Sequence, residues 1–210
     1  AYRLINESWK IYAENAAELR CDFDFITTGR TSAPIDDPNT IVYHPENIFI
    51  EEGAKIQAAI ISAENGPVYI GKKAQVLMGS MINGSFALCE GAVVNMGSKI
   101  KGDTTIGPFC KVGGEISNSV LFGNSNKGHD GFLGNSVLGE WCNLGADTNT
   151  SNLKNNYAEV KIWNYQKNGF KSTGQLFCGL MMGDHSKCGI NTMFNTGTVI
   201  GVNANIFGSG

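Results

Sequence analysis

The sequence predicts an all-β solenoid, in which short parallel strands wind into stacked coils, and two observations carry this prediction. Every sixth residue from Ile70 to Val112 is aliphatic, which gives eight consecutive matches. A period of six fits neither a helical turn nor the two-residue alternation of a strand, but it fits a short strand followed by a tight corner. In addition, 27 of the 210 residues are glycine, which tolerates the positive φ that tight corners require.

Three six-residue units close a triangular coil of eighteen residues, so the repeat is that of a hexapeptide β-helix. We expect the repeated residue to face the axis of the coil. After a slip of two residues, the series resumes and contains one polar member, Asn126. The nineteen predicted core positions are Ile70, Val76, Ile82, Leu88, Val94, Ile100, Ile106, Val112, Val120, Asn126, Phe132, Leu138, Leu144, Leu176, Met182, Cys188, Phe194, Ile200 and Ile206.

The first 47 residues lack the repeat. Residues 1–20 predict a short amphipathic helix, and three prolines mark residues 21–47 as a linker. One face of that helix would hold Leu4, Ile5, Trp9, Tyr12 and Leu19. We predict a solenoid over residues 48–210, with a small excursion at 62–67. We interpret residues 1–47 as the end of an upstream domain that this chain lacks.

Residues 150–175 form a second, longer break in the repeat. A long excursion from a regular solenoid is usually functional or disordered. This one contains aromatic residues and four lysines, with Glu159 as its one acid, so we expect it to contact anionic ligands. The lysines are Lys154, Lys161, Lys167 and Lys171.

Composition excludes several classes of protein. The formal net charge is -3 and no basic run occurs, which disfavours nucleic acids and anionic membranes as partners. No apolar stretch approaches the ~18 residues that span a bilayer, and the N-terminus has charges where a secretion signal would be apolar. The six cysteines show no CxxC pairs, so we expect reduced thiols and a cytoplasmic protein.

Of the three histidines, His129 is the candidate for chemistry. His44 lies in the linker, and His185 does not share the inward register of Cys188, so we predict no metal site. Asp147 follows His129 by eighteen residues, which would place the two side chains one strand spacing apart. A carboxylate there would orient the imidazole and favour its protonated form. The alternative is a surface histidine in a polar ladder.

The segment GHDGFLGNSVLGEWCNLGADTNTSNLKNN, which begins at residue 128, carries a resemblance. It resembles the acetyltransferase half of the bifunctional N-acetylglucosamine-1-phosphate uridyltransferase/glucosamine-1-phosphate N-acetyltransferase family, including its archaeal sugar-phosphate nucleotidyltransferase relatives. The family pattern is roughly NHLxYxGDxxIGxxxNIGAGTxxxN. The fit covers about residues 100–210, and the hexapeptide repeat extends it to about residue 50. The resemblance implies that the coils wind left-handed.

The resemblance also implies an activity, acetyl transfer from acetyl-coenzyme A to the amine of glucosamine 1-phosphate. His129 matches the family's general base, and Asn152 and Lys161 match residues of the sugar-phosphate pocket. Gly183, Ile190 and the segment 206–210, which includes Gly208, match the coils that receive acetyl-coenzyme A. The family forms homotrimers, so we expect the excursion to lie against a neighbouring subunit, with Lys161 near His129. A longer parent chain would also carry a sugar-1-phosphate nucleotidyltransferase domain.

Two departures from the pattern keep other functions open. Phe132 stands where the family commonly has tyrosine, and Asp147 replaces a glycine, which puts a charge beside the base. A catalytically degenerate solenoid that trimerises or regulates a sugar-phosphate nucleotidyltransferase is therefore the alternative, and binding of acetyl-coenzyme A separates the two. A zinc-dependent carbonic anhydrase of the same repeat needs three histidines, and this solenoid has two.

Overall fold

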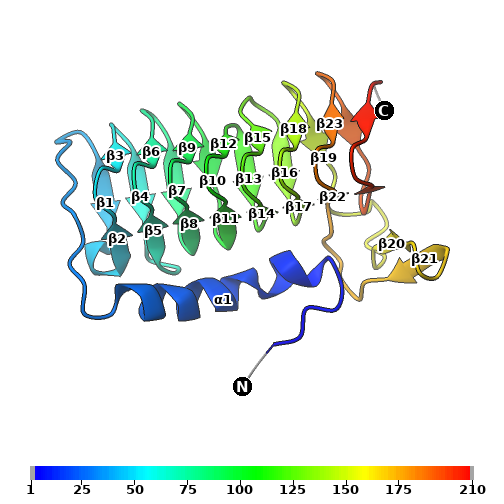
Figure 1. Ribbon diagram of the computed structural model, residues 1–210, viewed down its shortest axis with the longest axis horizontal. Helices are drawn as coiled ribbons and strands as arrows, with labels where there is room; N and C mark the ends of the chain where they lie inside the picture. The colour runs from blue at the N-terminus through cyan, green and yellow to red at the C-terminus, as the bar shows by residue number, and fades with distance from the viewer. Residues whose placement is uncertain (1–2, 209–210) are drawn as a thin grey trace.

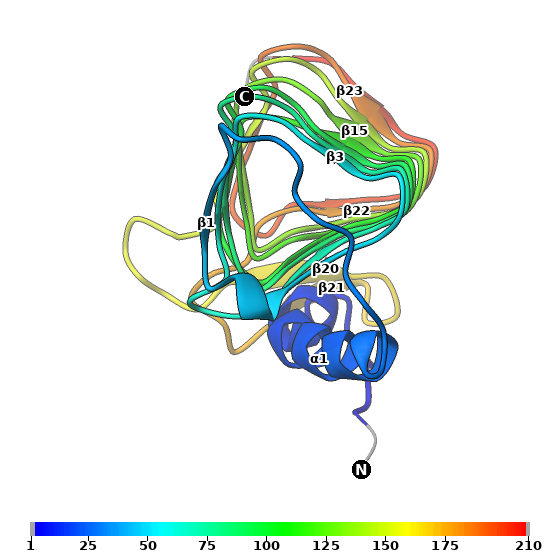
Figure 2. The ribbon, with the colours of Figure 1, turned by 90° about the vertical axis from the view of Figure 1, so that its left-hand side faces the viewer.

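The computed structural model describes residues 3–208 and is a triangular solenoid with one long helix along its flank (Figure 1). Viewed along its axis, the solenoid has three walls, each a parallel sheet (Figure 2). In that view the coils recede from the N-terminal end, and the chain passes counterclockwise from one wall to the next. The winding is therefore left-handed, and the predicted fold class is confirmed.

Walls B and C each take one strand from eight coils, and wall A takes one strand from the first six. Wall A contains β1 (Ile41–Tyr43), β4 (Ile60–Ser62), β7 (Met81–Asn83), β10 (Lys99–Ile100), β13 (Glu115–Ser117) and β16 (Phe132–Gly134). Wall B contains β2 (Ile48–Ile50), β5 (Val68–Ile70), β8 (Phe86–Leu88), β11 (Thr104–Ile106), β14 (Val120–Leu121), β17 (Val137–Leu138), β22 (Met181–Met182) and β25 (Val199–Ile200). Wall C contains β3 (Lys55–Ile56), β6 (Gln75–Val76), β9 (Val93–Val94), β12 (Lys111–Val112), β15 (Asn126–Lys127), β18 (Asn143–Leu144), β23 (Lys187–Cys188) and β26 (Asn205–Ile206). The pair β19 (Asn149–Thr150) and β24 (Met193–Phe194) follows β16, and the 3-10 helix η1 (Pro45–Asn47) precedes β2.

The core confirms the first aliphatic series, because all eight residues from Ile70 to Val112 are buried. Between Val112 and Leu138 the predicted register is wrong by one residue, and it is right again at Leu138 and Leu144, which are buried in the core. The inward residues are Leu121, Lys127 and Leu133, whereas Asn126 and Phe132 are only partly buried. The predicted neighbour Val120 is buried on the outside of wall B, in the cluster that includes Trp9 and Tyr12.

The register shifts because two successive coils are shorter than eighteen residues. On wall C, Lys111 pairs with Asn126 and Asn126 pairs with Asn143, which are steps of 15 and 17 residues. In the last series, Met182, Cys188 and Phe194 are buried, and Ile200 and Ile206 pack partly buried against the core. Leu176 is 48% exposed, so its prediction as a core residue is wrong, and Leu180 is buried instead.

Helix α1 (Lys10–Thr27) packs along the outside of wall B (Figure 1). Its start is fixed by Trp9 and Tyr12, which are buried against the wall, and the Tyr12 hydroxyl donates to the Phe177 carbonyl at 2.9 Å. The helix lies further along the chain than predicted, because it begins at Lys10 and ends at Thr27 rather than occupying residues 1–20. Leu4 and Ile5, which we expected on its apolar face, are exposed.

Beyond the helix, the guanidinium of Arg30 donates two hydrogen bonds, of 2.8 and 2.7 Å, to the buried Glu51 carboxylate. These bonds tie the segment after α1 to the first coil. That coil begins at Ile41 in β1, earlier than the predicted residue 48. No helix in residues 3–208 has the length and apolar character needed to traverse a bilayer.

The long excursion folds into an antiparallel hairpin of β20 (Lys161–Asn164) and β21 (Gly169–Ser172). Val160 and Ile162 are buried together with Trp9 and Met181. Lys171 forms an ion pair with Glu7, and its ammonium lies 5.6 Å from the centre of the Trp9 ring. The hairpin therefore packs on its own chain, on the wall B side, whereas we expected it against a neighbouring subunit.

Candidate active site

His129 lies on the corner that joins β15 of wall C to β16 of wall A, and its side chain is exposed. It lines a groove of about 380 Å³ together with Asn126, Asn143, Lys111 and Ile190. The structure thus brings together three residues of the predicted site, His129, Asn126 and Ile190. Two amides and one ammonium beside an imidazole can bind a polar, anionic ligand and exchange a proton with it.

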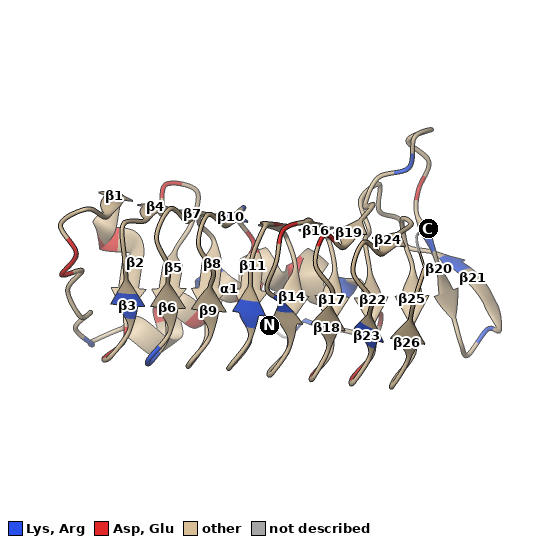
Figure 3. Ribbon diagram, turned by 90° about the horizontal axis from the view of Figure 1, so that it is seen from above, with Lys and Arg blue, Asp and Glu red and all other residues tan. Residues whose placement is uncertain are grey.

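The outer face of wall C is sparsely charged, and its charge is basic. Its strands contribute Lys55, Lys111 and Lys187 to the surface and contain no acidic residue. Figure 3 shows this wall from outside, with the basic residues of β3 and β23 in blue. An anionic ligand would therefore meet a favourable potential along this wall.

The backbone of the His129 corner is held at three consecutive carbonyl groups. The Asn95 side-chain amide donates to the Gly128 carbonyl at 2.7 Å. The ammonium of Lys127 donates to the His129 carbonyl, also at 2.7 Å. The backbone N–H of Asp147 donates to the Asp130 carbonyl at 3.1 Å. Because each carbonyl has a donor, the corner that carries His129 is fixed by bonds outside the regular strand ladder.

Asp147 does not occupy the predicted place beside His129. Its backbone N–H bonds to Asp130, and the strand register puts Ala146 level with His129. The coil here has 17 residues, so a spacing of eighteen misses the column by one position. Within residues 3–208 no ion pair joins His129 to a carboxylate. A catalytic role for Asp147 stays a prediction, without the expected contact.

Lys127 is a site residue that the sequence analysis missed. It is 2% exposed and occupies an inward position of wall C. Burial lowers its pKa to about 8, although the nearby carboxylates of Asp130 and Asp147 oppose this shift. The signal was present in the sequence, because the corrected register places a lysine in the column of Val94 and Val112.

Phe132 and Asn152 lie together on the wall A side of the corner. The side-chain amide of Asn152 donates to the Asn135 side-chain oxygen at 2.8 Å, and the Phe132 N–H donates to the Asn149 side chain at 2.8 Å. Both side chains crowd Gly134, where an added Cβ would lie 2.8 Å from the Asn152 amide nitrogen. A side chain at residue 134 would therefore have to displace the ends of the Phe132 and Asn152 side chains.

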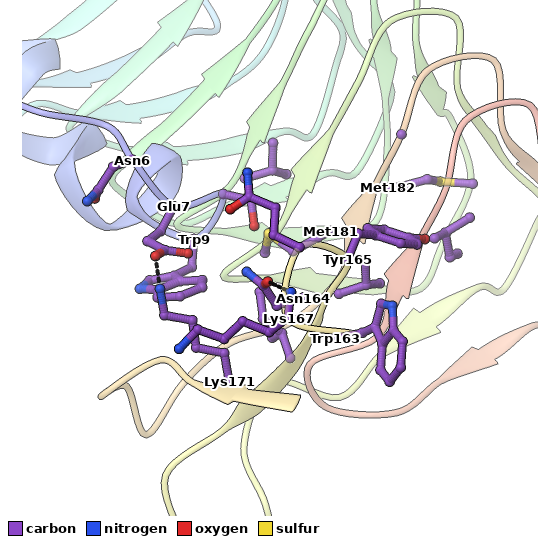
Figure 4. Close-up of a pocket in the computed structure, with 17 residues that line it drawn as sticks. Asn6, Glu7, Trp9, Trp163, Asn164, Tyr165, Lys167, Lys171, Met181 and Met182 are labelled. Atoms are coloured by element: carbon purple, nitrogen blue, oxygen red, sulfur yellow. Dashed lines mark hydrogen bonds and ion pairs between the residues drawn. The ribbon is translucent and has the colours of Figure 1, made fainter. Parts of the chain in front are cut away.

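The remaining predicted residues lie apart from His129 within this chain. Lys161 is exposed on β20, next to the backbone of Gly197. Gly183 lines a different cavity, of about 510 Å³, between wall B, the hairpin and the segment before α1 (Figure 4). Gly208 is exposed and lines neither cavity. The residues after Gly208 in the predicted coenzyme segment lie outside the described part of the chain.

The second cavity is lined by aromatic, aliphatic and charged side chains. Figure 4 shows Trp163, Tyr165 and Met181 around it, with Lys167 near the Glu7–Lys171 ion pair. Lys171 is neutralised by Glu7, so Lys167 supplies the cavity's uncompensated positive charge among the residues that line it. The predicted coenzyme residues Gly183 and Ile190 therefore face two separate cavities.

The described residues contain no group of three or more His, Cys, Asp or Glu side chains placed to hold a metal ion. His185 is exposed and stacks on Trp141, with ring centres 6.2 Å apart and planes at 5°. Cys188 lies in the core. All six cysteines are free thiols.

Comparison with known proteins gives matches over part of the chain. No protein-family model matches it. Over 89 residues, 42% of this chain, it is 35% identical to the bifunctional protein GlmU of Methanocaldococcus jannaschii, of which the match covers 21%. Over 90 residues, 43% of this chain, it is 37% identical to the protein of the same name from Methanococcus maripaludis, of which the match also covers 21%. Over 93 residues, 44% of this chain, it is 34% identical to the bifunctional sugar-1-phosphate nucleotidylyltransferase/acetyltransferase of Sulfurisphaera tokodaii, of which the match covers 23%.

The matched segment spans about a fifth of the length of these relatives. These matches confirm the resemblance that the sequence analysis identified. The chain is similar, over less than half of its length, to bifunctional transferases named GlmU or sugar-1-phosphate nucleotidylyltransferase/acetyltransferase.

Proposed function

We propose that this chain is an acyltransferase module that moves an acetyl group from acetyl-coenzyme A to the amine of an amino-sugar phosphate such as glucosamine 1-phosphate. The observation that carries the proposal is the exposed imidazole of His129 over a groove lined by Asn126, Asn143 and Lys111. The similarity to bifunctional acetyltransferases supports the same reaction class.

In this reaction His129 is the general base. The neutral imidazole takes one proton from the ammonium group of the sugar, and the freed nitrogen lone pair attacks the thioester carbonyl. Backbone N–H groups stabilise the tetrahedral oxyanion. As the intermediate collapses, the carbon–sulfur bond breaks, the imidazolium gives its proton to the departing thiolate, and the former amine nitrogen releases its second proton to solvent. The products are the N-acetylated sugar phosphate and free coenzyme A.

Substrate recognition follows from the lining of the groove. Lys111 pairs in register with Asn126, and Asn126 with Asn143, so one ammonium and two amides form a row across three adjacent strands. An ammonium suits the phosphate, and amides suit sugar hydroxyls, because amides both donate and accept hydrogen bonds. Within one chain Lys111 thus replaces Lys161 as the cation next to His129. Phe132 and Asn152 bound the same corner on wall A.

We further propose that the module works as a homotrimer with the His129 groove near a subunit boundary. By strand register, His129 shares its exposed column with Met78, Met96, Ala146 and Ile190. Met96 and Ile190 are 65% and 70% exposed. Burial of these exposed apolar side chains against another subunit would be favourable. In the trimer a neighbour's hairpin could then bring Lys161 to this groove.

We also propose a second activity for a longer parent chain and a cellular compartment for the protein. A longer parent chain would add sugar-1-phosphate nucleotidyltransferase activity, as the names of the relatives suggest for those proteins. The free thiols of all six cysteines suit a reducing compartment, so we propose the cytoplasm.

The test is a thiol-release assay with acetyl-coenzyme A and four acceptors: glucosamine 1-phosphate, glucosamine 6-phosphate, galactosamine 1-phosphate and unphosphorylated glucosamine. Direct binding of acetyl-coenzyme A is measured in parallel by calorimetry. Turnover with a phosphorylated amino sugar, well above that with glucosamine, supports the proposal. If no acceptor is turned over, the proposal is contradicted, whether or not acetyl-coenzyme A binds. Absent coenzyme binding in a stable trimer favours the degenerate solenoid.

A further inference from the structure

Lys127 occupies a position that every neighbouring coil fills with a smaller apolar side chain. It pairs in register with Val112, which in turn pairs with Val94, and both valines are buried in the core. Lys127 itself is 2% exposed and is the one lysine buried among the described residues. A charged side chain in an apolar core is costly unless its donors are satisfied.

The ammonium is satisfied by backbone, not by a carboxylate. It donates to the Gly113 carbonyl at 2.9 Å and to the His129 carbonyl at 2.7 Å. Among the described residues no carboxylate lies within ion-pair distance of it, although Asp130 and Asp147 are close enough to act on its charge. The two carbonyls belong to successive coils, so the ammonium bridges the corner before His129 to the corner that carries it.

This bridge stands where the coils shorten. The steps between paired residues on wall C fall to 15 and 17 residues on either side of Lys127. The corner has no room to adjust, because a Cβ on Gly113 would lie 2.5 Å from the Gly128 carbonyl oxygen. Lys127 thus occupies the interior of the one irregular corner of wall C from which a histidine projects into a groove.

We propose that Lys127 is a positioning residue for His129: its buried ammonium fixes the His129 carbonyl and so the corner that carries the imidazole. The fixed carbonyl sets where the ring stands over the groove. A general base must be held at a set position to accept a proton from its substrate. The kinetic part of this inference rests on the proposed acetyltransferase function.

The experiment compares Lys127→Met with the wild-type protein and with Leu138→Met. Methionine follows the shape of lysine without its charge, and Leu138 is a fully buried residue of wall B in the coil that follows, so it controls for a new methionine in the core. The ring C–H chemical shifts of the three histidines are measured by NMR at one fixed pH, with His129 assigned by its absence from His129→Ala. Steady-state kinetics are measured on the same proteins.

In Lys127→Met we expect the His129 ring resonances to move, while those of His44 and His185 keep their positions, because the bonds that fix the His129 corner are lost. We expect kcat to fall about tenfold or more, with KM changed less than twofold, because the base is misplaced while the groove is kept. Leu138→Met should change neither quantity. His129 ring resonances that are unchanged in Lys127→Met overturn the inference, even if kcat falls through a general loss of stability.

Two provisions keep the inference open to failure. If Lys127→Met does not fold, Lys127→Gln is tested in the same way, since its amide can still donate to one of the carbonyls. If the wild-type protein transfers no acetyl group, the proposed function fails, and the His129 ring resonances alone then decide the role of Lys127.

Discussion

The ammonium nitrogen of Lys127 lies 2.7 Å from the carbonyl oxygen of His129, in the inward column of wall C that Val94 and Val112 also occupy. Lys127 thus contacts the backbone of His129, the candidate base, and not its imidazole ring. This relationship has consequences for stability as well as for chemistry, because the folded state holds a proton on Lys127 less readily than the unfolded chain does.

The first prediction concerns stability at alkaline pH. Burial lowers the pKa of Lys127 from 10.5 to about 8, so between these values the unfolded chain binds more protons than the folded protein. The contribution of Lys127 therefore becomes more favourable to folding as pH rises, by about 2 to 3 kcal/mol between pH 8 and 10. The difference in unfolding free energy between wild type and Lys127→Met, measured in urea at pH 7 and pH 10, isolates this group. A difference that is the same at both pH values contradicts the prediction.

The second prediction concerns the pair of hydrogen bonds between Arg30 and Glu51, which ties the segment after α1 to the first coil. Burial opposes ionisation of Glu51, but hydrogen bonds from Tyr69 and Arg30 outweigh it and hold the pKa of Glu51 below its ordinary value. Arg30 also lies 4.9 Å from the centre of the Phe49 ring. Glu51→Gln should reduce the unfolding free energy by about 1 to 2 kcal/mol at pH 7. Because the folded pKa is lowered, this loss should shrink as pH falls through the folded pKa of Glu51, and equal losses at pH 7 and pH 3 would refute it.

The third prediction concerns the crowded glycine of wall A. Gly134→Ala introduces a Cβ against Phe132 and Asn152, so the unfolding free energy should fall by about 1 to 3 kcal/mol. Gly123→Ala is the matched control, because the nearest atom to its added Cβ is 3.5 Å away. Thermal unfolding of the two variants tests the pair. Equal stabilities would show that Phe132 and Asn152 move aside freely.

The fourth prediction tests whether Lys111, the lysine that lines the His129 groove, binds the phosphate of the substrate. Lys111→Met should raise KM for the sugar phosphate about tenfold and leave KM for acetyl-coenzyme A within twofold. The reason is that Lys111 lines the His129 groove and a charge-assisted bond to phosphate is strong. Lys187→Met, on the same wall and outside that groove, is the control. If Lys187→Met has the larger effect, the phosphate does not bind as proposed.

The regular part of the fold could be predicted residue by residue, and the candidate site only in part. From Ile70 to Val112 successive coils on wall C are eighteen residues long, so the period alone identifies the core. Past Val112 the coil length changes, and no periodic pattern tells how many residues a corner uses. This one-residue error concealed Lys127 and misplaced Asp147, although it left His129 and Asn126 in the same groove.

Two errors outside the repeat have different causes. Helix α1 continues to Thr27 because the sequence to that point contains no glycine or proline to end it, a local signal that was present in the sequence. The hairpin of the excursion lies on wall B because Val160 and Ile162 are buried against Trp9, far away in sequence. That contact does not follow from the composition of the excursion, which indicated only an affinity for anions.

The most direct test of the account is the acetyl-transfer rate of His129→Ala, measured by release of coenzyme A thiol with saturating acetyl-coenzyme A and the best acceptor of the panel. His129 is exposed on its corner, so the substitution should leave the fold and coenzyme binding intact. We expect kcat to fall by ~10² to 10⁴, the usual contribution of a positioned general base. His129→Ala with the kcat of the wild-type protein would contradict the mechanism.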